Sequence, residues 1–200
     1  MKDFWEERYS ETSLAYGLEP NLYFKQQLNL LKPGKILLAL EGEGRNAIYA
    51  AKKGWDVTAF DFSKKGQQKA FQLAKKNGVN IKYELVDVNQ FKTELKFNAI
   101  GLIFAHLPPL VRKEFHANCE KLLEVNGIVI SQHFHPNQIK YNYPSGGPKK
   151  EDMLYSLEML QSDFKYLQYI EGEEKEIELF EGKYHQGKAF VTNFTGRFKK

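Results

Sequence analysis

The chain has 200 residues, of which 42% are hydrophobic and 27% are charged, and its formal net charge is +4. These proportions are ordinary for a soluble globular protein, and the length suits a single domain over residues 1–200. The 29 basic residues are interspersed with 25 acidic ones. No basic stripe forms, which argues against nucleic-acid binding.

Targeting signals and disulfides are also not expected. No apolar run approaches the roughly 18 residues of a membrane-spanning helix, and the first residues contain no apolar segment of signal-peptide length. Cys119 is the only cysteine, and its apolar neighbours in a helical pattern predict a buried thiol. We therefore expect a cytoplasmic protein in a reducing compartment, without membrane partners.

The first 31 residues mix aromatic and charged side chains. Phe4, Trp5, Arg8 and Tyr9 have helical spacing, which Gly17 to Pro20 interrupts. Asn21 is suited to cap a second helix that ends near Leu31. Two interpretations remain open: a packed N-terminal helix pair, or a helical flap over a bound cofactor.

From residue 35 onward, strand patterns alternate with helix patterns. The predicted strands span 36–40, 56–60, 81–86, 97–104 and 128–132, and the predicted helices span 46–53, 63–76 and 109–123. Such alternation predicts an α/β fold with a doubly wound, mostly parallel sheet.

The C-terminal part has a different pattern. Residues 134–152 are rich in Pro, Gly, Asn and Tyr and are predicted to form a long loop, interpreted as a lid over the acceptor pocket. A short helix is expected over 155–161. Two strands then follow without a helix between them, over 166–170 with an extension to 180, and over 188–194. They would complete a Rossmann-like sheet of seven strands with a C-terminal antiparallel hairpin.

The glycine-containing turn after the first predicted strand is the main functional signal. Gly42 and Gly44 allow a tight turn and a close approach of backbone to a ligand, and the next helix begins near Asn46. A nucleotide-like cofactor is one interpretation, and an ordinary strand–helix turn is the other. The polar residues at the carboxyl ends of the predicted strands, where ligands bind in such sheets, are Glu41, Glu43, Asp61, Asp87 and His106.

These residues together resemble the class I S-adenosylmethionine-dependent methyltransferases. The closest resemblance is to the small tellurite-resistance and thiopurine methyltransferase-like enzymes. It rests on Gly42-Glu-Gly-Arg-Asn-Ala47, on Gly54 to Ser63, on Phe4 to Tyr9, on Tyr16 to Asn21 and on Leu122 to Gly127. It implies S-adenosyl-L-methionine as the cofactor and a small molecule as the methyl acceptor. We expect a monomer or a weak homodimer.

The resemblance also implies roles for individual residues. Gly42, Gly44 and Asn46 belong to the motif beside the methionine part of the cofactor, and Asp61 would hold the ribose. Phe62 would pack on the adenine, flanked by Asp87 and Val88. Phe104 to Leu107 would line the passage to the acceptor. The residues expected to close over the carboxylate end of the cofactor are Arg8, Tyr9 and Tyr16.

The chain departs from the family pattern at two positions. The family's first strand commonly ends with an acidic residue followed by Gly-x-Gly-x-Gly, whereas this chain has Leu38 and Leu40 at the early positions. Glu41 or Glu43 would then supply the negative charge for the cofactor's ammonium group.

His106 is the best-placed candidate for a general base at the end of the fourth strand. A histidine that only shapes the pocket is the alternative. His133 and His135 face the same way on a strand, and His185 would be the third ligand of a metal site. No fixed spacing supports that site, and we predict no metal.

Two other functions remain open. Gly42-x-Gly44-x-x-Ala47 and Asp61 also suit a nicotinamide-dependent oxidoreductase. Against that reading stand Asp87, the terminal hairpin and the aromatic N-terminal segment. A protein that binds the cofactor without turnover is the second alternative.

Overall fold

The computed structural model of the chain describes residues 2–199. Its centre is a seven-stranded sheet with the order β3-β2-β1-β4-β5-β7-β6. The strands are β1 (Lys35–Ala39), β2 (Asp56–Asp61), β3 (Lys82–Leu85), β4 (Phe97–Ile103), β5 (Leu123–Phe134), β6 (Leu167–Glu181) and β7 (His185–Phe198). Strands β1 to β5 run parallel to one another, and β7 lies antiparallel between β5 and β6. The predicted sheet and terminal hairpin are confirmed.

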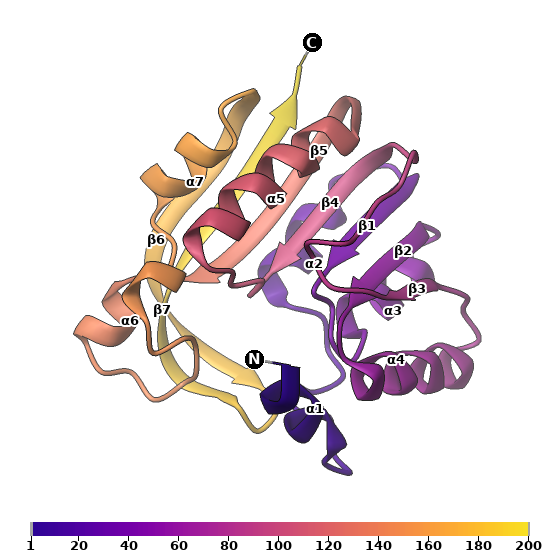
Figure 1. Cartoon of the computed structure of the whole chain (residues 1–200), viewed down its shortest axis with the longest axis horizontal. Helices are drawn as coiled ribbons and strands as arrows, with labels where there is room; N and C mark the ends of the chain where they lie inside the picture. Colours follow the sequence, from indigo (N-terminus) through magenta and orange to yellow (C-terminus); the bar gives the residue numbers. More distant parts are fainter. Residues whose placement is uncertain (1, 200) are drawn as a thin grey trace.

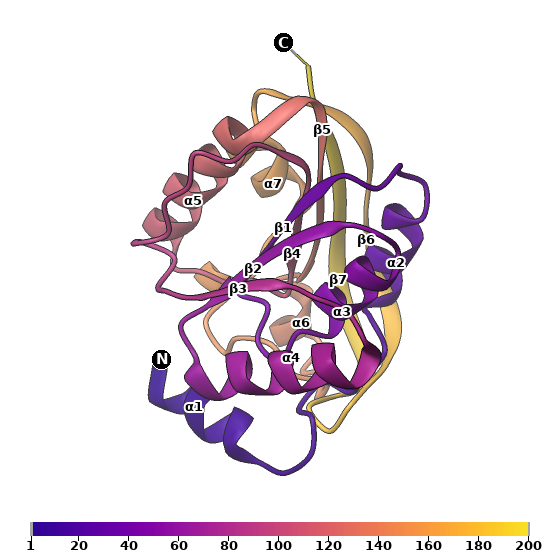
Figure 2. The same ribbon diagram turned by 90° about the vertical axis from the view of Figure 1, so that its right-hand side faces the viewer.

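Helices cover both faces of the sheet, as Figure 2 shows. One face carries α2 (Leu22–Leu28), α3 (Arg45–Lys52) and α4 (Lys64–Asn77), and the other carries α5 (Pro109–Leu122) and α7 (Leu157–Asp163). Because side chains alternate along a strand, Ile36 and Leu38 of β1 pack on the first face, and Leu37 and Ala39 pack on the second.

Local signals explain where several helices begin. The Asn21 side chain accepts a hydrogen bond from the Phe24 amide, and the Ser63 hydroxyl accepts one from the Gly66 amide. Both are N-caps of the predicted kind. Helix α4 ends at Gly78, which has a φ of 65° and can adopt the left-handed conformation without a side-chain penalty. Cys119 is fully buried, as its apolar neighbours predicted.

Three predicted segments differ from the structure. Strand β5 begins at Leu123, directly after α5, rather than at Ile128, and its pairing with β4 shifts register between Phe97 and Ala99. The segment 134–152 is not structureless, because it contains α6 (Asn137–Lys140) and most of the 3₁₀ helix η1 (Glu151–Met153). Strand β7 is also longer than the predicted 188–194, whereas β6 follows the predicted extension to residue 180.

The N-terminal helix α1 (Lys2–Ser10) lies at the end of the sheet where the parallel strands finish. In Figure 1 the tip of the β6–β7 hairpin reaches the same place. Lys183 at the tip pairs with Glu11 at 3.0 Å, and the Tyr184 amide donates to the Ala15 carbonyl at 3.4 Å. Two segments distant in sequence thus meet beside the glycine-containing turn.

Candidate functional site

The turn between β1 and α3 holds the backbone in left-handed conformations. Gly42 has a φ of 59° and Gly44 a φ of 88°, and Leu40 adopts the same region at 52° although it is not glycine. A Cβ on Gly42 would lie 2.4 Å from the Tyr9 hydroxyl oxygen, and one on Gly44 would lie 2.7 Å from the Ala70 Cβ. Both glycines therefore allow a close approach of protein groups from α1 and α4.

Replacing Gly42 with alanine should lower the free energy of unfolding by about 2–3 kcal/mol, from left-handed strain together with displacement of Tyr9. Gly78→Ala is the matched control, because Gly78 has a similar φ of 65° and nothing within 4 Å of its added Cβ. It should cost only about 1 kcal/mol. Urea denaturation measures both, and equal losses would show that Tyr9 does not pack against Gly42. Tryptophan fluorescence should report the displacement, because Trp5 stacks on Tyr9 at 5.4 Å between ring centroids.

The acidic side chains of this turn are directed at protein groups. One Glu41 carboxylate oxygen accepts hydrogen bonds from the Asn46 and Ala47 amides, both at 2.8 Å. Burial raises the pKa of Glu41 to about 7. Glu43 pairs with Lys69 at 2.7 Å and accepts from the Ala15 amide at 2.7 Å. The start of α3 is therefore capped by Glu41, which leaves those amides unavailable to a cofactor carboxylate.

Asn46 is also bound to the protein. Its side-chain oxygen accepts from the Asn21 amide at 2.9 Å, and this links α3 to the start of α2. Leu38 is fully buried among the residues that pack under α2 and α3. The position where the family has an acid is thus part of the apolar core in this chain.

Asp61 and Asp87 lie at the carboxyl ends of the neighbouring strands β2 and β3. The two oxygens of Asp61 each accept one hydrogen bond, from the Ser63 amide at 2.8 Å and from the Gly42 amide at 3.2 Å. Burial raises the pKa of Asp61 to about 6. One oxygen of Asp87 accepts from the Asn89 amide at 2.9 Å. Because a carboxylate has about four acceptor positions, both groups keep capacity for further donors.

Phe62 and Val88 directly follow and flank these carboxylates, and both are partly buried. Val88 packs against the hydrophobic core beneath α5. The structure therefore brings Asp61, Phe62, Asp87 and Val88 to one edge of the sheet, next to the glycine turn.

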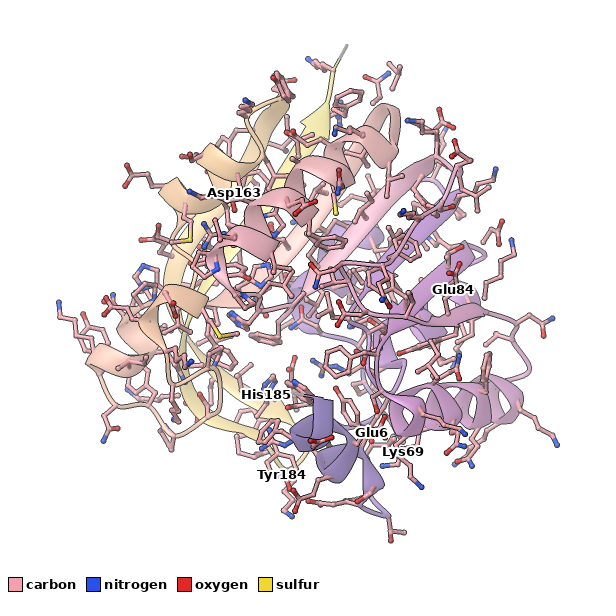
Figure 3. The ribbon with its side chains drawn as sticks, in the orientation of Figure 1. Glu6, Lys69, Glu84, Asp163, Tyr184 and His185 are labelled. Atoms are coloured by element: carbon pink, nitrogen blue, oxygen red, sulfur yellow. The ribbon has the colours of Figure 1, made fainter. Side chains whose placement is uncertain are left out.

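The predicted N-terminal residues lie over the same end of the sheet. Tyr9 is buried against Gly42. A guanidinium nitrogen of Arg8 donates to the Tyr16 hydroxyl at 3.0 Å. Glu6 accepts from the Lys64 amide at 2.6 Å and so fastens α1 to the start of α4. In Figure 3, Glu6 and Lys69 mark this junction.

His106 does not have the geometry of a general base. Its Nδ1 lies 2.6 Å from the Met153 carbonyl oxygen, and its Nε2 accepts from the Phe134 amide at 3.2 Å. A carbonyl can only accept, so Nδ1 carries the proton and the lone pair of Nε2 is already used. Burial lowers the pKa of His106 to about 3. The structure therefore argues against a catalytic role and favours the alternative, a histidine that holds the pocket wall.

Glu181, Arg45 and His185 form a charged cluster that the sequence did not reveal. One oxygen of Glu181, at the end of β6, is 2.8 Å from the Arg45 guanidinium and 3.0 Å from Nδ1 of His185. Burial acts to raise the pKa of Glu181, but His185 and Arg45 together hold it at about 2. The His185 ring is 4.6 Å from the Phe104 ring. The hairpin register pairs Glu181 with His185, and the fold brings Arg45 to them from far away in the sequence.

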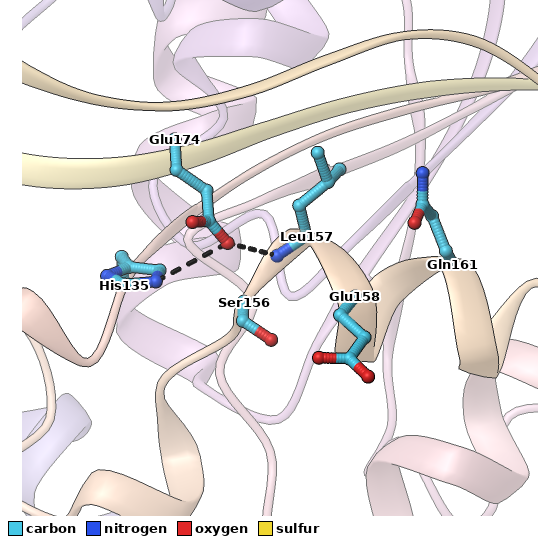
Figure 4. A pocket seen from close by; sticks show the side chains of 6 residues that line it. All are labelled: His135, Ser156, Leu157, Glu158, Gln161 and Glu174. Carbon is cyan, nitrogen blue, oxygen red and sulfur yellow. Dashed lines mark hydrogen bonds and ion pairs between the residues drawn. The ribbon is translucent and has the colours of Figure 1, made fainter.

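Two cavities are present, one away from this cluster and one bordered by it. One of about 490 Å³ opens beside α7, where Glu174 accepts from the Leu157 amide at 2.7 Å and lies 3.4 Å from His135 (Figure 4). The other, of about 440 Å³, separates the segment before α2 from β6 and includes Tyr16, Asn21, Gln132 and Glu181. Among residues 2–199, no three His, Cys, Asp or Glu side chains are grouped to hold a metal. Within the same residues, no helix combines the length and apolarity needed to cross a bilayer.

Known proteins resemble this chain in sequence and in fold. The sequence model of the family described as tellurite resistance protein TehB matches residues 1–130. TehB from Haemophilus influenzae has a TM-score of 0.75 and 19% identity, with 99% of this chain and 67% of that chain covered. A search of curated proteins finds no match.

Two further structures contain a bound cofactor product. The N-methyltransferase NodS from Bradyrhizobium japonicum WM9, in complex with S-adenosyl-L-homocysteine, has a TM-score of 0.71 and 12% identity, covering 100% of this chain and 98% of that one. The magnesium protoporphyrin IX methyltransferase ChlM from Synechocystis PCC 6803, also with S-adenosyl-L-homocysteine, has a TM-score of 0.67 and 14% identity, with 98% and 93% covered. At these identities the likeness shows a shared fold.

Proposed function

The chain belongs to the family of the tellurite resistance protein TehB, and from that membership we propose that it transfers a methyl group from S-adenosyl-L-methionine to a small-molecule acceptor. Its fold is that of S-adenosylmethionine-dependent methyltransferases. The observation that carries the proposal is the pair of carboxylates, Asp61 and Asp87, at adjacent strand ends beside the glycine turn.

The residues at this edge fit the adenosine half of the cofactor. Asp61 keeps acceptor capacity for ribose hydroxyls, and Asp87 has a second oxygen that suits the adenine amino group. Phe62 and Val88 supply apolar surface for the base. On the methionine side, Tyr9 packs against Gly42 of the turn, and Arg8 holds the Tyr16 hydroxyl.

The proposed reaction is an in-line displacement. When bound, the cofactor supplies an electrophilic methyl group on a sulfonium, so the protein mainly aligns an acceptor and excludes water. Glu11, the residue after α1, pairs with Lys183 at the tip of the β6–β7 hairpin and so joins the two segments. Together they provide a cover over the carboxyl end of the sheet.

A labelled-methyl experiment tests turnover. The protein is incubated with S-adenosylmethionine carrying a ¹³C methyl group and a mixture of small thiols, phenols, amines and carboxylates. Mass spectrometry should detect a labelled small molecule and an equal amount of S-adenosylhomocysteine. Label found only on the protein itself would contradict a small-molecule acceptor. Cofactor binding without any product would favour a protein that binds without turnover.

A further inference from the structure

Glu181 fixes the proton position on His185. The two residues flank the tight turn between β6 and β7, where Gly182 has a φ of 63°. A Glu181 oxygen lies 3.0 Å from Nδ1 of His185, and an ionised carboxylate can only accept. Nδ1 therefore carries the proton, and Nε2 presents a lone pair. This is the arrangement in which a carboxylate orients a histidine base.

The surroundings of His185 connect it to the candidate site. Its ring lies 4.4 Å from the Tyr16 ring, 4.6 Å from Phe104 after β4 and 5.3 Å from Phe134 at the end of β5. The loop before η1 passes close to the same ring, because a side-chain carbon on Gly146 would lie 3.1 Å from Cδ2 and 3.5 Å from Nε2 of His185. Figure 3 shows His185 beside Tyr184 at the hairpin, facing the N-terminal helix.

The charged groups near His185 are already paired. Arg45 binds Glu181 and the Tyr16 carbonyl, and Arg8 binds the Tyr16 hydroxyl and lies 3.9 Å over the Tyr184 ring. Burial lowers the pKa of His185, Glu181 acts to raise it, and Arg45 and Arg8 act to lower it. His106 is also neutral, and burial keeps the Tyr16 hydroxyl protonated by raising its pKa. A methyl acceptor bound beside His185 would therefore contact a neutral histidine and aromatic rings. It would not meet a free cation, because Arg45 and Arg8 are both paired.

We propose that His185, positioned by Glu181, removes the proton from the methyl acceptor, and that the acceptor is a thiol or phenol with apolar character. The inference rests on the proposed methyltransferase function. The acceptor's sulfur or oxygen forms a bond to the methyl carbon. The bond between the methyl carbon and the cofactor's sulfonium breaks, and its electron pair stays on the cofactor's sulfur. The acceptor's proton moves to Nε2 of His185 and then to water. A base is needed only because such an acceptor carries a proton at neutral pH.

Three probes separate this role from simple pocket shaping: phenylmethanethiol, 4-methylphenol and iodide, an anion with no proton to lose. His185→Gln should slow methylation of the thiol or phenol about 100-fold and change the iodide rate little. Glu181→Gln should alter the pH profile for the protonated acceptors.

His135→Gln is the matched control, because His135 also contacts a glutamate but lies at the cavity beside α7. It should leave all rates unchanged. Equal losses with iodide and thiol in His185→Gln would overturn the proposal.

Nitrogen NMR of the His185 ring provides a readout that does not need turnover. We expect a protonated Nδ1 and an unprotonated Nε2 in the wild type, and an Nε2 shift when either protonated probe is added with S-adenosylhomocysteine. A protonated Nε2, or no response to either probe, would refute the assignment. Failure of S-adenosylhomocysteine to bind would instead refute the proposed function, so the two failures are distinguishable.

Discussion

Replacing Asp163 with alanine is expected to lower the free energy of unfolding by about 3–5 kcal/mol. Asp163, labelled in Figure 3, ends α7 and lies 2.7 Å from Nε of Arg112 and 2.9 Å from Nδ1 of His116, both on α5. All three side chains are 4% exposed or less. The large effect is expected because the substitution would leave the Arg112 charge buried without its carboxylate.

The pKa of Asp163 gives this prediction a pH signature. Burial acts to raise that pKa, but hydrogen bonds from His116 and Arg112 lower it below its ordinary value. A lowered pKa in the folded state means that the contribution is present above the unfolded pKa and is lost as the pH falls through the folded value.

Urea denaturation tests the Asp163 prediction against a matched pair. Asp56→Ala removes the carboxylate from an exposed pair with Lys82, whose side chains are 52% and 63% exposed. That variant should lose less than about 1 kcal/mol. Similar losses for the two variants would show that the buried cluster does not stabilise the contact between α5 and α7. Both variants should retain cofactor affinity when folded, because neither residue lies at the candidate site.

Replacing Asp61 with alanine is expected to weaken S-adenosylhomocysteine binding by about 1–3 kcal/mol, or about 5–150-fold. The loss has two sources, the acceptor for the ribose and the hydrogen bond that holds the Gly42 amide at 3.2 Å. Asp61→Asn retains one acceptor oxygen and should lose less. Asp56→Ala serves again as the control, because Asp56 begins the strand that Asp61 ends. An affinity unchanged in Asp61→Ala would remove the ribose role.

The pH dependence of binding offers an independent check on Asp61. Burial raises its pKa to about 6, so the group becomes neutral as the pH falls below that value. A protonated carboxyl is the weaker acceptor for hydroxyl donors. Wild-type affinity should therefore decrease below about pH 6, and Asp61→Asn should lack this component. Equal slopes in the two proteins would assign the pH dependence to another group.

Patterns that act over a few residues predicted most of the fold. Buried strands such as 36–40 gave clear apolar runs, and the caps at Asn21 and Ser63 worked as their side-chain chemistry suggests. The start of β5 was missed because Asn126 and Gly127 resemble a turn, whereas the structure accommodates them in a strand with an irregular register. The helix α6 has four residues, too few for a periodic signal.

The candidate site was harder to predict because side-chain direction depends on tertiary partners. Glu41 follows β1 as expected, but the free amides at the start of α3 attract its carboxylate. His106 follows β4 as expected, but the Met153 carbonyl and the Phe134 amide occupy both of its nitrogens. His185 gained its carboxylate partner only through the hairpin register.

Titration calorimetry of the wild-type protein with S-adenosylhomocysteine, run beside NADH and NADPH, decides which class of cofactor the glycine turn binds. We expect saturable one-site binding of S-adenosylhomocysteine and no saturable binding of either nicotinamide cofactor. Saturable NADH binding, with no heat from S-adenosylhomocysteine, would contradict this expectation.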